Sequence, residues 1–534
     1  MGLLILPGLL VLSAAAIAAT AAVSLWWLFA LVPLLLLTAL GARDYVQREH
    51  SILRSYPVLG HMRFLLERIR PELQQYFIER NYDGRPYDRD TRTVIYQRAK
   101  GTHGEQAFGT ERDVEASGYE FVVHSVGPRE PEPEQPRVRI GGPDCTKPYD
   151  TALLNVSAMS FGALSAHAIR ALNRGAALGG FAHDSGEGGV SPHHREGGDL
   201  VWELGSGYFG ARTADGRFDP ARFREKAADP QIKMVELKLS QGAKPGIGGV
   251  LPGAKVTPEI AAIRGVPVGV KCVSPPAHKV FSTPRELVLF IAQMRELADG
   301  KPAGFKLCVG SRAEILGICK AMVDEGVTPD FIVVDGSEGG TGAAPLEFED
   351  HVGMPLTDGL ITLHNALVGT GLRDRIKIGA SGKVATGMDI VKRIAQGADY
   401  TNAARAMMMA VGCIQAQKCQ TNHCPTGVAT QDPRRSRALD VPDKSERVRR
   451  FQQATVAEAQ QLIASMGLEG PHELCPGMLM RRIDHHAVTS FAEIYEWLEP
   501  GQLLAEPPHS WAADWKAANP DRFGLAPVLT PHGR

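Results

Sequence analysis

Residues 304–335 read GFKLCVGSRAEILGICKAMVDEGVTPDFIVVD, and this stretch decides the fold class. The apolar runs at 304–309 and 331–335 predict two short strands that are buried on both faces. Between them, Ser311 and Glu314 have the spacing of a capping box, and Gly326 follows the helical run. A strand, a helix and a second strand in this order predict neighbouring parallel strands joined by a crossover helix.

The same alternation continues from about residue 151 to residue 412. Thr283 and Thr386 stand where two further helices are predicted to start. Eight strand–helix units in this segment predict an α/β chain with a (β/α)8 barrel of TIM type. An open doubly wound sheet is the alternative, and residues 184–232 are interpreted as a long insertion in the second unit. The other candidate strands are 153–157, 178–183, 234–238, 268–273, 376–380 and 399–403.

The first 42 residues contain no Asp, Glu, Lys or Arg. As a helix, this length would be about twice the thickness of a bilayer core, so two membrane spans are predicted with a turn near Ser24. One span followed by a buried apolar segment is the alternative. Arginines outnumber acidic residues after the second span, which predicts a cytoplasmic-membrane protein whose main body lies in the cytoplasm.

Four regions are therefore expected. Residues 1–42 form two transmembrane helices, and residues 43–150 form a juxtamembrane amphipathic helix and an irregular wrapping segment. Residues 151–439 form the barrel, and residues 440–534 form a helical C-terminal extension and tail. The net charge of −1 gives no electrostatic case for nucleic-acid binding.

Residues 412–431 read GCIQAQKCQTNHCPTGVATQ and bring three cysteines close together in sequence. Cys413, Cys419 and Cys424 are separated by five and then four residues, and a proline follows the last. Thiolates spaced in this way can converge on one soft-metal centre, and a Cys-Pro ending is common at iron–sulfur ligands. Three ligands suggest a [3Fe–4S] cluster or a cluster with one open iron. A zinc site completed by His423 and a set of free thiols are the alternatives.

Glycine-rich loops follow two late strands of the expected barrel. They read DGSEGGTGAAP at 335–345 and GASGKVATGMD at 379–389, and the second leads into a capped helix. Backbone N–H groups in such loops and at helix N-termini bind anions, so the two loops predict a phosphate-bearing cofactor. Lys383 would add positive charge to this site.

Charged residues also follow apolar strands. Lys238 and Lys306 are expected to point into the barrel mouth toward an anionic partner, with solvent-exposed lysines as the alternative. Glu187 lies in the glycine-rich run DSGEGG and is a candidate acid–base group, although a plain turn residue would fit as well. The chain has no dinucleotide-binding fingerprint, so a separate electron-donor protein or a quinone is expected.

Residues 145–500 resemble the central domain of the glutamate synthase large subunit. The similar runs include SAMSFGALS at 157–165, DSGEGG at 184–189, ELKLSQGAKPGIGGVLPGAKV at 236–256, VSPPAHKVFS at 273–282 and the cysteine segment. The resemblance implies a (β/α)8 barrel with FMN at its C-terminal mouth and a [3Fe–4S] cluster beside it. In that family, 2-oxoglutarate and ammonia form 2-iminoglutarate, which is reduced to glutamate.

The resemblance also implies roles for individual residues. It makes Cys413, Cys419 and Cys424 the cluster ligands, Lys306 the lysine that faces the flavin ring, and Glu187 the glutamate beside the substrate. It implies FMN contacts at one strand end and in the two phosphate loops, at Ala158, Met159, Ser160, Gly336, Gly339, Gly340, Gly382 and Lys383.

The chain departs from the family pattern in four ways. It shows no glutaminase domain, because no cysteine precedes Cys145, and no β-helical C-terminal domain. Tyr208 stands where the family has a substrate-side arginine, and Ser337 and Glu338 are substituted in a phosphate loop.

The implied function is that of a membrane-anchored FMN and iron–sulfur oxidoreductase. It would carry out reductive amination of 2-oxoglutarate, or of a related 2-oxo acid or imine, with free ammonia or an amine. A redox-sensing or electron-relay module that uses the same cofactors is the alternative from another class. A flavin-dependent isomerase is a third possibility, but it would have no need of the three cysteines.

Overall fold

A computed structural model describes residues 4–102 and 104–524. The chain divides into two compact units, Met1–Arg89 and Asp90–Arg534. Each unit has its own internal packing, and each is described separately below.

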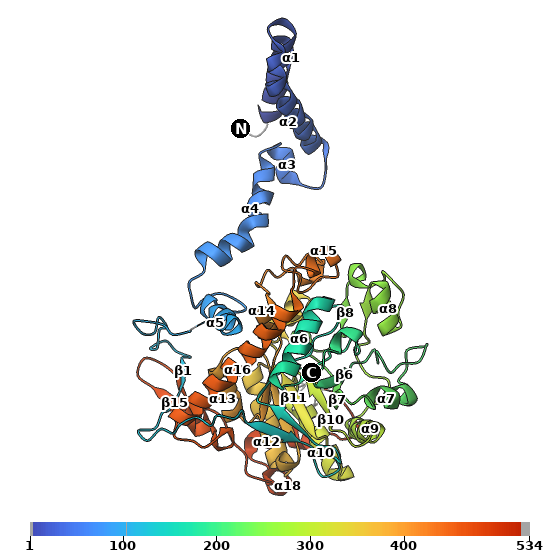
Figure 1. Cartoon of the computed structure of the whole chain (residues 1–534), viewed down its shortest axis with the longest axis vertical. Coiled ribbons are helices and arrows are strands. Elements are labelled where there is room, and N and C mark those ends of the chain that lie inside the picture. The colour runs from blue at the N-terminus through green and yellow to red at the C-terminus, as the bar shows by residue number, and fades with distance from the viewer. Residues whose placement is uncertain (1–3, 103, 525–534) are drawn as a thin grey trace, which may run out of the picture. The chain divides into compact units, whose positions relative to one another are not determined.

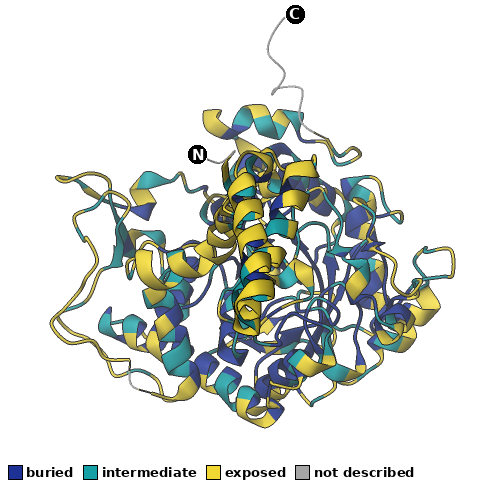
Figure 2. Cartoon of the chain, turned by 90° about the horizontal axis from the view of Figure 1, so that it is seen from above, coloured by how far each residue is buried: buried dark blue, intermediate teal, exposed yellow. Residues whose placement is uncertain are grey.

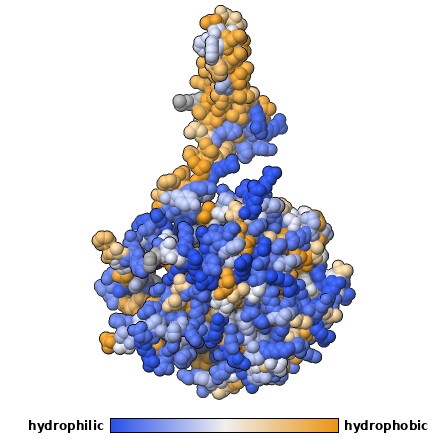
Figure 3. All heavy atoms as spheres, in the orientation of Figure 1, coloured by the Kyte–Doolittle hydropathy of each residue, from blue (hydrophilic) through white to orange (hydrophobic). Residues whose placement is uncertain are grey.

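The first unit begins with two apolar helices, α1 (Ile5–Ala22) and α2 (Leu28–Val46), joined through the short turn η2 (Leu25–Trp27). Both helical segments are long and apolar enough to cross a membrane, and hydrophobic side chains cover them in Figure 3. The Ser24 side chain accepts the Trp26 N–H at the turn. The hydroxyl groups of Ser13 on α1 and Thr38 on α2 lie 2.9 Å apart, so one polar pair links the two helices.

The sequence predicted one amphipathic helix after α2, but the structure has three shorter helical pieces there. They are α3 (Ser51–Ser55), α4 (Gly60–Leu73) and η3 (Gln74–Ile78). Val58 has a positive φ of 65° between α3 and α4, which breaks the helical path. The buried Asp44 carboxylate fixes this bend, because it accepts the Val58 N–H at 2.9 Å and lies 2.9 Å from the His61 Nε2 atom.

The second unit contains a closed barrel of eight parallel strands, which confirms the predicted (β/α)8 fold. Strand β13 pairs with β4 and closes the barrel, with Thr401 opposite Leu154. The barrel strands are dark blue in Figure 2 because they are buried on both faces. In barrel order they are β4 (Leu154–Val156), β5 (His183–Asp184), β6 (Leu200–Leu204), β7 (Ile232–Lys238), β10 (Ala303–Leu307), β11 (Phe331–Asp335), β12 (Lys377–Ser381) and β13 (Tyr400–Ala403).

Two predicted elements of the barrel were wrong. The interpretation of 184–232 as an insertion overlooked β6, whose sequence LVWEL carries a buried Glu203 that interrupts the apolar signal. The run at 268–273 is not a barrel strand. Its last two residues form β9 (Cys272–Val273), which pairs in antiparallel fashion with β8 (Val250–Leu251), while Val268 and Val270 are exposed.

One end of the barrel is covered by a hairpin of β2 (Arg137–Ile140) and β3 (Tyr149–Ala152). Ile140 packs with Ala182, Phe331 and Tyr400, which lie where their strands begin. The opposite end, where the strands finish, is left for the loops. This is the end at which (β/α)8 barrels carry their sites.

Helices surround the barrel (Figure 1). The caps of α9 and α13 were predicted correctly: Thr283 accepts the Glu286 N–H, and Thr386 and Asp389 form a reciprocal capping box. Ser311 stands at the start of α10 but makes no cap bond, and the Glu314 side chain accepts the Gly524 N–H at 2.9 Å. The barrel helices are α6 (Ala166–Gly179), α7 (Pro220–Ala227), α8 (Pro258–Arg264), α9 (Pro284–Leu297), α10 (Arg312–Glu325), α12 (Leu356–Gly369), α13 (Gly387–Ala395) and α14 (Arg405–Val411).

Further elements pack around this barrel. The long helix α16 (Val441–Ser465) lies so close to α6 that a Cβ atom at Gly175 would stand 2.7 Å from the Val448 side chain. The remaining named elements are α5 (Arg89–Lys100), β1 (Glu120–Val122), α11 (Leu346–His351), α15 (Pro433–Ser436), β14 (Leu479–Arg482), β15 (Val488–Ser490), α17 (Phe491–Ile494), α18 (Gln502–Ala505) and α19 (His509–Ala517).

Candidate functional site at the barrel mouth

Glu187 lies in the loop after β5 and forms an ion pair inside the mouth. Its Oε1 atom is 2.9 Å from the Lys238 Nζ atom at the end of β7, and the two side chains are only 14% and 11% exposed. Gly205 leaves room for the carboxylate, because a Cβ atom there would lie 2.7 Å from Glu187 Oε2. Glu187 is thus a held, buried group rather than a plain turn residue.

Two more cations act on Glu187. Burial alone would raise the pKa of this carboxyl, but attraction to Lys238, Arg264 and Lys244 holds the pKa below its ordinary value. Lys244 is itself buried, and its ammonium donates to the Ala343 carbonyl at 2.9 Å. Burial and the nearby Lys238 lower the pKa of Lys244 to about 8. Three cations, Lys238, Arg264 and Lys244, therefore act on the Glu187 carboxylate.

Arg264, the last residue of α8, lies against glycine residues of two mouth loops. A Cβ atom at Gly188 would lie 2.7 Å from Arg264 Nη2, and one at Gly162 would lie 3.3 Å from it. The guanidinium donates to the Phe161 carbonyl at 3.2 Å, while its buried Nε has no partner among the described residues. Arg264 therefore brings a positive charge against the glycine residues of these two loops.

The strand end that the sequence singled out lies beside Glu187. Ser160 Oγ accepts the Gly188 N–H at 3.2 Å, and Met159 N donates to the Asp184 carbonyl at 3.0 Å. Gly186 has a φ of +64°, and a Cβ atom there would lie 2.8 Å from the Ser160 backbone nitrogen. Ala158, Met159 and Ser160 therefore form a close-packed wall of the mouth.

Lys306 lies deeper, among three buried carboxylates. Its ammonium contacts Glu203 closely and lies 3.2 Å from Glu236 and 3.6 Å from Asp184. Burial alone would lower the pKa of Lys306, but these carboxylates raise it well above its ordinary value. Burial, together with Glu203, raises the pKa of Asp184 to about 7. Lys306 has anionic partners, as expected, but they belong to the protein.

The two glycine-rich loops lie side by side, as their sequence predicted. The Gly336 N–H donates to the Ser381 carbonyl at 2.9 Å, and Gly382 has a φ of +145° that favours glycine. Gly340 packs on Arg405, with 2.6 Å between an ideal Cβ atom and Arg405 Cδ. Arg405 donates to the Glu338 carbonyl, so a second basic residue joins Lys383 (φ +52°) at these loops.

The substituted Glu338 has a structural task. Its Oε2 atom accepts the Leu356 N–H at 2.8 Å and so caps α12. Gly339 N donates to the Gly336 carbonyl at 2.8 Å, which closes the turn. The two loops and the capped start of α13 together form a glycine-rich cradle, of the kind at which anions bind in other proteins.

The three cysteines lie in one strained loop after α14. Cys413 and Cys419 are partly exposed and Cys424 is buried. The loop contains three non-glycine residues with positive φ, at Gln415, Gln417 and Asn422. Strain of this kind persists where surrounding structure imposes it and is concentrated at functional sites.

The environments of the three sulfur atoms differ. Burial raises the pKa of Cys413 to about 12 and also raises that of Cys419. Burial would raise the pKa of Cys424 too, but hydrogen bonds from the backbone of Ala429, Thr426 and Val428 hold it below its ordinary value. Cys424 is therefore ready to be a thiolate ligand, whereas the other two need a metal to lose their protons.

The cysteine segment is attached to the mouth. Gln431 Nε2 donates to the carbonyls of Gly162 and Leu164 at 3.0 and 2.8 Å, in the loop after β4. Lys255 lies between the same loop and the cysteines: its ammonium donates to the Ala163 carbonyl at 2.9 Å. Burial lowers the pKa of Lys255 to about 8, and Cys419 and Cys424 act against this shift.

Tyr208, which stands where the family has a substrate-side arginine, is fully buried with a φ of +51°. Its hydroxyl accepts the Lys279 N–H at 2.9 Å and lies 3.3 Å from His278 Nδ1. Arg264 is the cation that faces this side, and sequence analysis missed it together with Lys244, Lys255 and Arg405.

Much of this chain is similar in sequence to known proteins. Residues 143–469 match the conserved region of glutamate synthase. The chain belongs to the glutamate synthase family. It is 38% identical over 484 residues to the glutamate synthase large subunit-like protein YerD of Bacillus subtilis. The match covers 82% of this chain and 91% of that protein.

Matches to other relatives cover a smaller part of this chain. This glutamate synthase family member is 35% identical over 320 residues to the archaeal-type glutamate synthase (NADPH) of Thermotoga neapolitana, and the match covers 60% of each chain. The chain thus spans less than two thirds of that relative. Among solved structures, mandelate oxidase with (S)-2-phenylpropionate is a distant likeness, with 15% identity, a TM-score of 0.42, and coverage of 75% of this chain and 97% of that chain.

Proposed function

We propose that this glutamate synthase-type oxidoreductase binds FMN and a [3Fe–4S] cluster and reductively aminates 2-oxoglutarate or a related 2-oxo acid. The nitrogen would come from free ammonia or an amine, and the electrons from a separate donor protein or a quinone. One observation carries the proposal: Glu187 is held by Lys238 at the rim to which the cysteine segment is also bound.

The residues at the mouth suit a 2-oxo acid. Lys244 and Arg264 can each hold a carboxylate group, since both are buried cations beside mouth loops. Glu187 Oε1 lies next to Lys238 Nζ, so a proton can be given to or taken from a nitrogen at this position. Bound FMN would supply the hydride, and the cluster would supply electrons one at a time.

The chain fits both groups. For FMN, the two glycine-rich loops with Lys383 and Arg405 would hold the phosphate, and Ala158, Met159 and Ser160 would contact the flavin. For the cluster, Cys413, Cys419 and Cys424 would supply three thiolate ligands from one loop.

Anaerobic purification and photoreduction test this proposal. We expect flavin absorbance together with bound iron, and we expect 2-oxoglutarate plus ammonium to reoxidise the reduced flavin with formation of glutamate. A reduced flavin that is never reoxidised by any 2-oxo acid with ammonium or an amine would leave only the electron-relay function.

The pKa of Lys244 leads to a pH prediction. This pKa is lowered to about 8, so the ammonium is charged at neutral pH and loses its proton as the pH rises through about 8. We expect the KM for 2-oxoglutarate to rise about tenfold over this interval, which corresponds to about 1.4 kcal/mol. Lys244→Arg should flatten the rise, because arginine stays charged. A wild-type KM that does not change with pH contradicts this role.

Lys255 gives a second prediction, which a redox titration of the cluster, followed by spectroscopy, can check. Its buried positive charge lies near Cys419 and Cys424 and would stabilise the reduced, more negative cluster. Lys255→Met should lower the midpoint potential of the cluster by about 60 mV, a tenfold change in a one-electron equilibrium. Lys255→Arg should restore the potential. An unchanged potential in Lys255→Met, with full iron content, would refute the electrostatic role.

We also propose that α1 and α2 anchor the protein in the cytoplasmic membrane, with the barrel in the cytoplasm. Their length and apolar composition support two spans, and arginines stand in the last turn of α2, at position 43, and after it, at positions 48 and 54. The exposed thiol of Cys475 reports the orientation. In spheroplasts, a membrane-impermeant maleimide should label Cys475 only after permeabilisation. Labelling of intact spheroplasts would reverse the proposed topology.

A further inference from the structure

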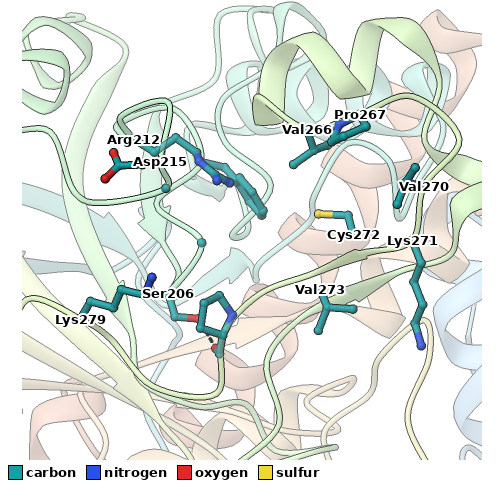
Figure 4. A pocket seen from close by; sticks show the side chains of 14 residues that line it. Ser206, Arg212, Asp215, Val266, Pro267, Val270, Lys271, Cys272, Val273 and Lys279 are labelled. Carbon is teal, nitrogen blue, oxygen red and sulfur yellow. Dashed lines mark hydrogen bonds between the residues drawn. The ribbon is translucent and has the colours of Figure 1, made fainter.

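A second hollow of about 280 Å³ lies apart from the catalytic mouth. Its walls come from two segments, 206–216 after β6 and 266–279 around β9. Figure 4 shows Arg212 reaching into it, with Ser206 and Lys279 on one side and Val266 and Cys272 on the other. Neither Glu187 nor any of the mouth cations lines this hollow.

The hollow has an excess of positive charge. It is lined by Arg212, Lys271 and Lys279, and no carboxylate of the described residues lies within ion-pair distance of these three side chains. Asp215 also lines it, but its oxygens are taken by Arg217 Nε at 2.6 Å and Thr213 Oγ1 at 2.5 Å. An anion that enters the hollow therefore meets cations that have no competing partner.

The remaining wall is apolar. The Arg212 guanidinium lies 5.5 Å from the centre of the Phe209 ring, and its side-chain N–H groups have no acceptor among the described residues. Val266, Val270 and Cys272 complete this wall. An organic anion with an apolar body fits such a surface better than an inorganic anion does, because its carbon atoms leave water.

We propose that this hollow is a binding site for a small organic carboxylate, separate from the catalytic mouth. Its carboxylate would contact Arg212 and Lys279, and its carbon chain would lie on the valines. This assignment does not depend on the identity of the substrate or cofactors.

Hydrogen bonds and packing connect this hollow to the loop that carries Glu187. Ser206 donates a hydrogen bond to the Pro275 carbonyl, and the Lys279 N–H donates to the Tyr208 hydroxyl. Gly205, directly before Ser206, packs on the Glu187 carboxylate. A carboxylate that bridges Arg212 and Lys279 would fix these two segments together, and with them the wall behind Glu187. The ligand would thus act as an effector of the mouth.

Calorimetric titration of the full-length protein in detergent tests the proposal, with succinate as the probe. Lys244→Gln serves as the background, because it weakens binding of a dicarboxylate at the mouth. We expect saturable succinate binding in this background and none of neutral succinamide. Adding Arg212→Gln or Lys279→Gln should weaken binding at least tenfold. Adding Arg224→Gln, an exposed arginine of α7 that does not line the hollow, should leave it unchanged.

Alkylation of Cys272 gives an independent readout. Cys272 lines the hollow and is 7% exposed, so succinate should slow its reaction with iodoacetamide, as followed by peptide mass spectrometry. Arg212→Gln should remove this protection. Two results would overturn the proposal. One is that Lys244→Gln alone abolishes succinate binding. The other is that succinate binding and Cys272 protection persist when Arg212→Gln or Lys279→Gln is added.

Discussion

Cys424→Ser is expected to remove nearly all bound iron from the purified protein. Cys424 is buried, and its pKa is held low by backbone N–H groups, so it is the sulfur best prepared to bind a metal as a thiolate. A serine hydroxyl would not ionise in its place, and two cysteines do not hold a three-iron centre. The measurements are iron and sulfide content and the electron paramagnetic resonance spectrum.

The matched control is Cys475→Ser, which changes an exposed thiol elsewhere in the chain. This variant should keep the iron content and spectrum of the wild type. Flavin absorbance should survive in both variants, because the glycine-rich cradle is built from other loops. Full iron in Cys424→Ser, or zinc in place of iron in the wild type, would show that the three cysteines do not form the proposed centre.

Glu187→Gln is expected to lower kcat by about 10²–10⁴-fold, the usual contribution of one acid–base group. Glutamine fills the same space beside Gly205 but carries neither charge nor a transferable proton at this position. The flavin content and its photoreduction should stay at the wild-type level, because Glu187 is not part of the phosphate cradle. Stopped-flow reoxidation of the reduced flavin by 2-oxoglutarate plus ammonium isolates the affected step.

Glu259→Gln is the control for this change. Glu259 is an exposed carboxylate of α8 that pairs with His193 at 2.9 Å, outside the mouth. Its replacement should alter kcat by no more than about twofold, since surface ion pairs contribute little. If Glu187→Gln keeps half or more of the wild-type kcat while substrate binds, Glu187 is not the acid–base group.

The architecture could be predicted because most of its strands carry a strong local signal. Residues 331–334 are an uninterrupted apolar run, and the structure has β11 at 331–335. Strand β6 could not be recognised in the same way, because Glu203 lies inside it and is neutralised only by Lys306, about one hundred positions later. An ionic partner so distant in sequence leaves no local pattern.

The residues of the candidate site also differ in how strong a local signal they leave in the sequence. The cysteine segment and the two glycine-rich loops could be singled out because each places several candidate functional groups within one short stretch. Arg264 was missed because it is a single basic residue at the end of an ordinary helix, and only folding brings it against Gly188 and Phe161. The surroundings of Tyr208 could not be predicted either, because an alignment position does not show that φ turns positive and directs the ring into the core.

Lys306 affects how any inactive variant at this position should be interpreted. It is the counterion for Glu203, Glu236 and Asp184 inside a closed barrel. Removing it would leave three acidic groups without a cation in a medium of low polarity, at a cost of several kcal/mol. Lost turnover in Lys306→Met would therefore report collapse of the scaffold, and chemistry at this residue can be judged only in variants whose melting temperature is preserved.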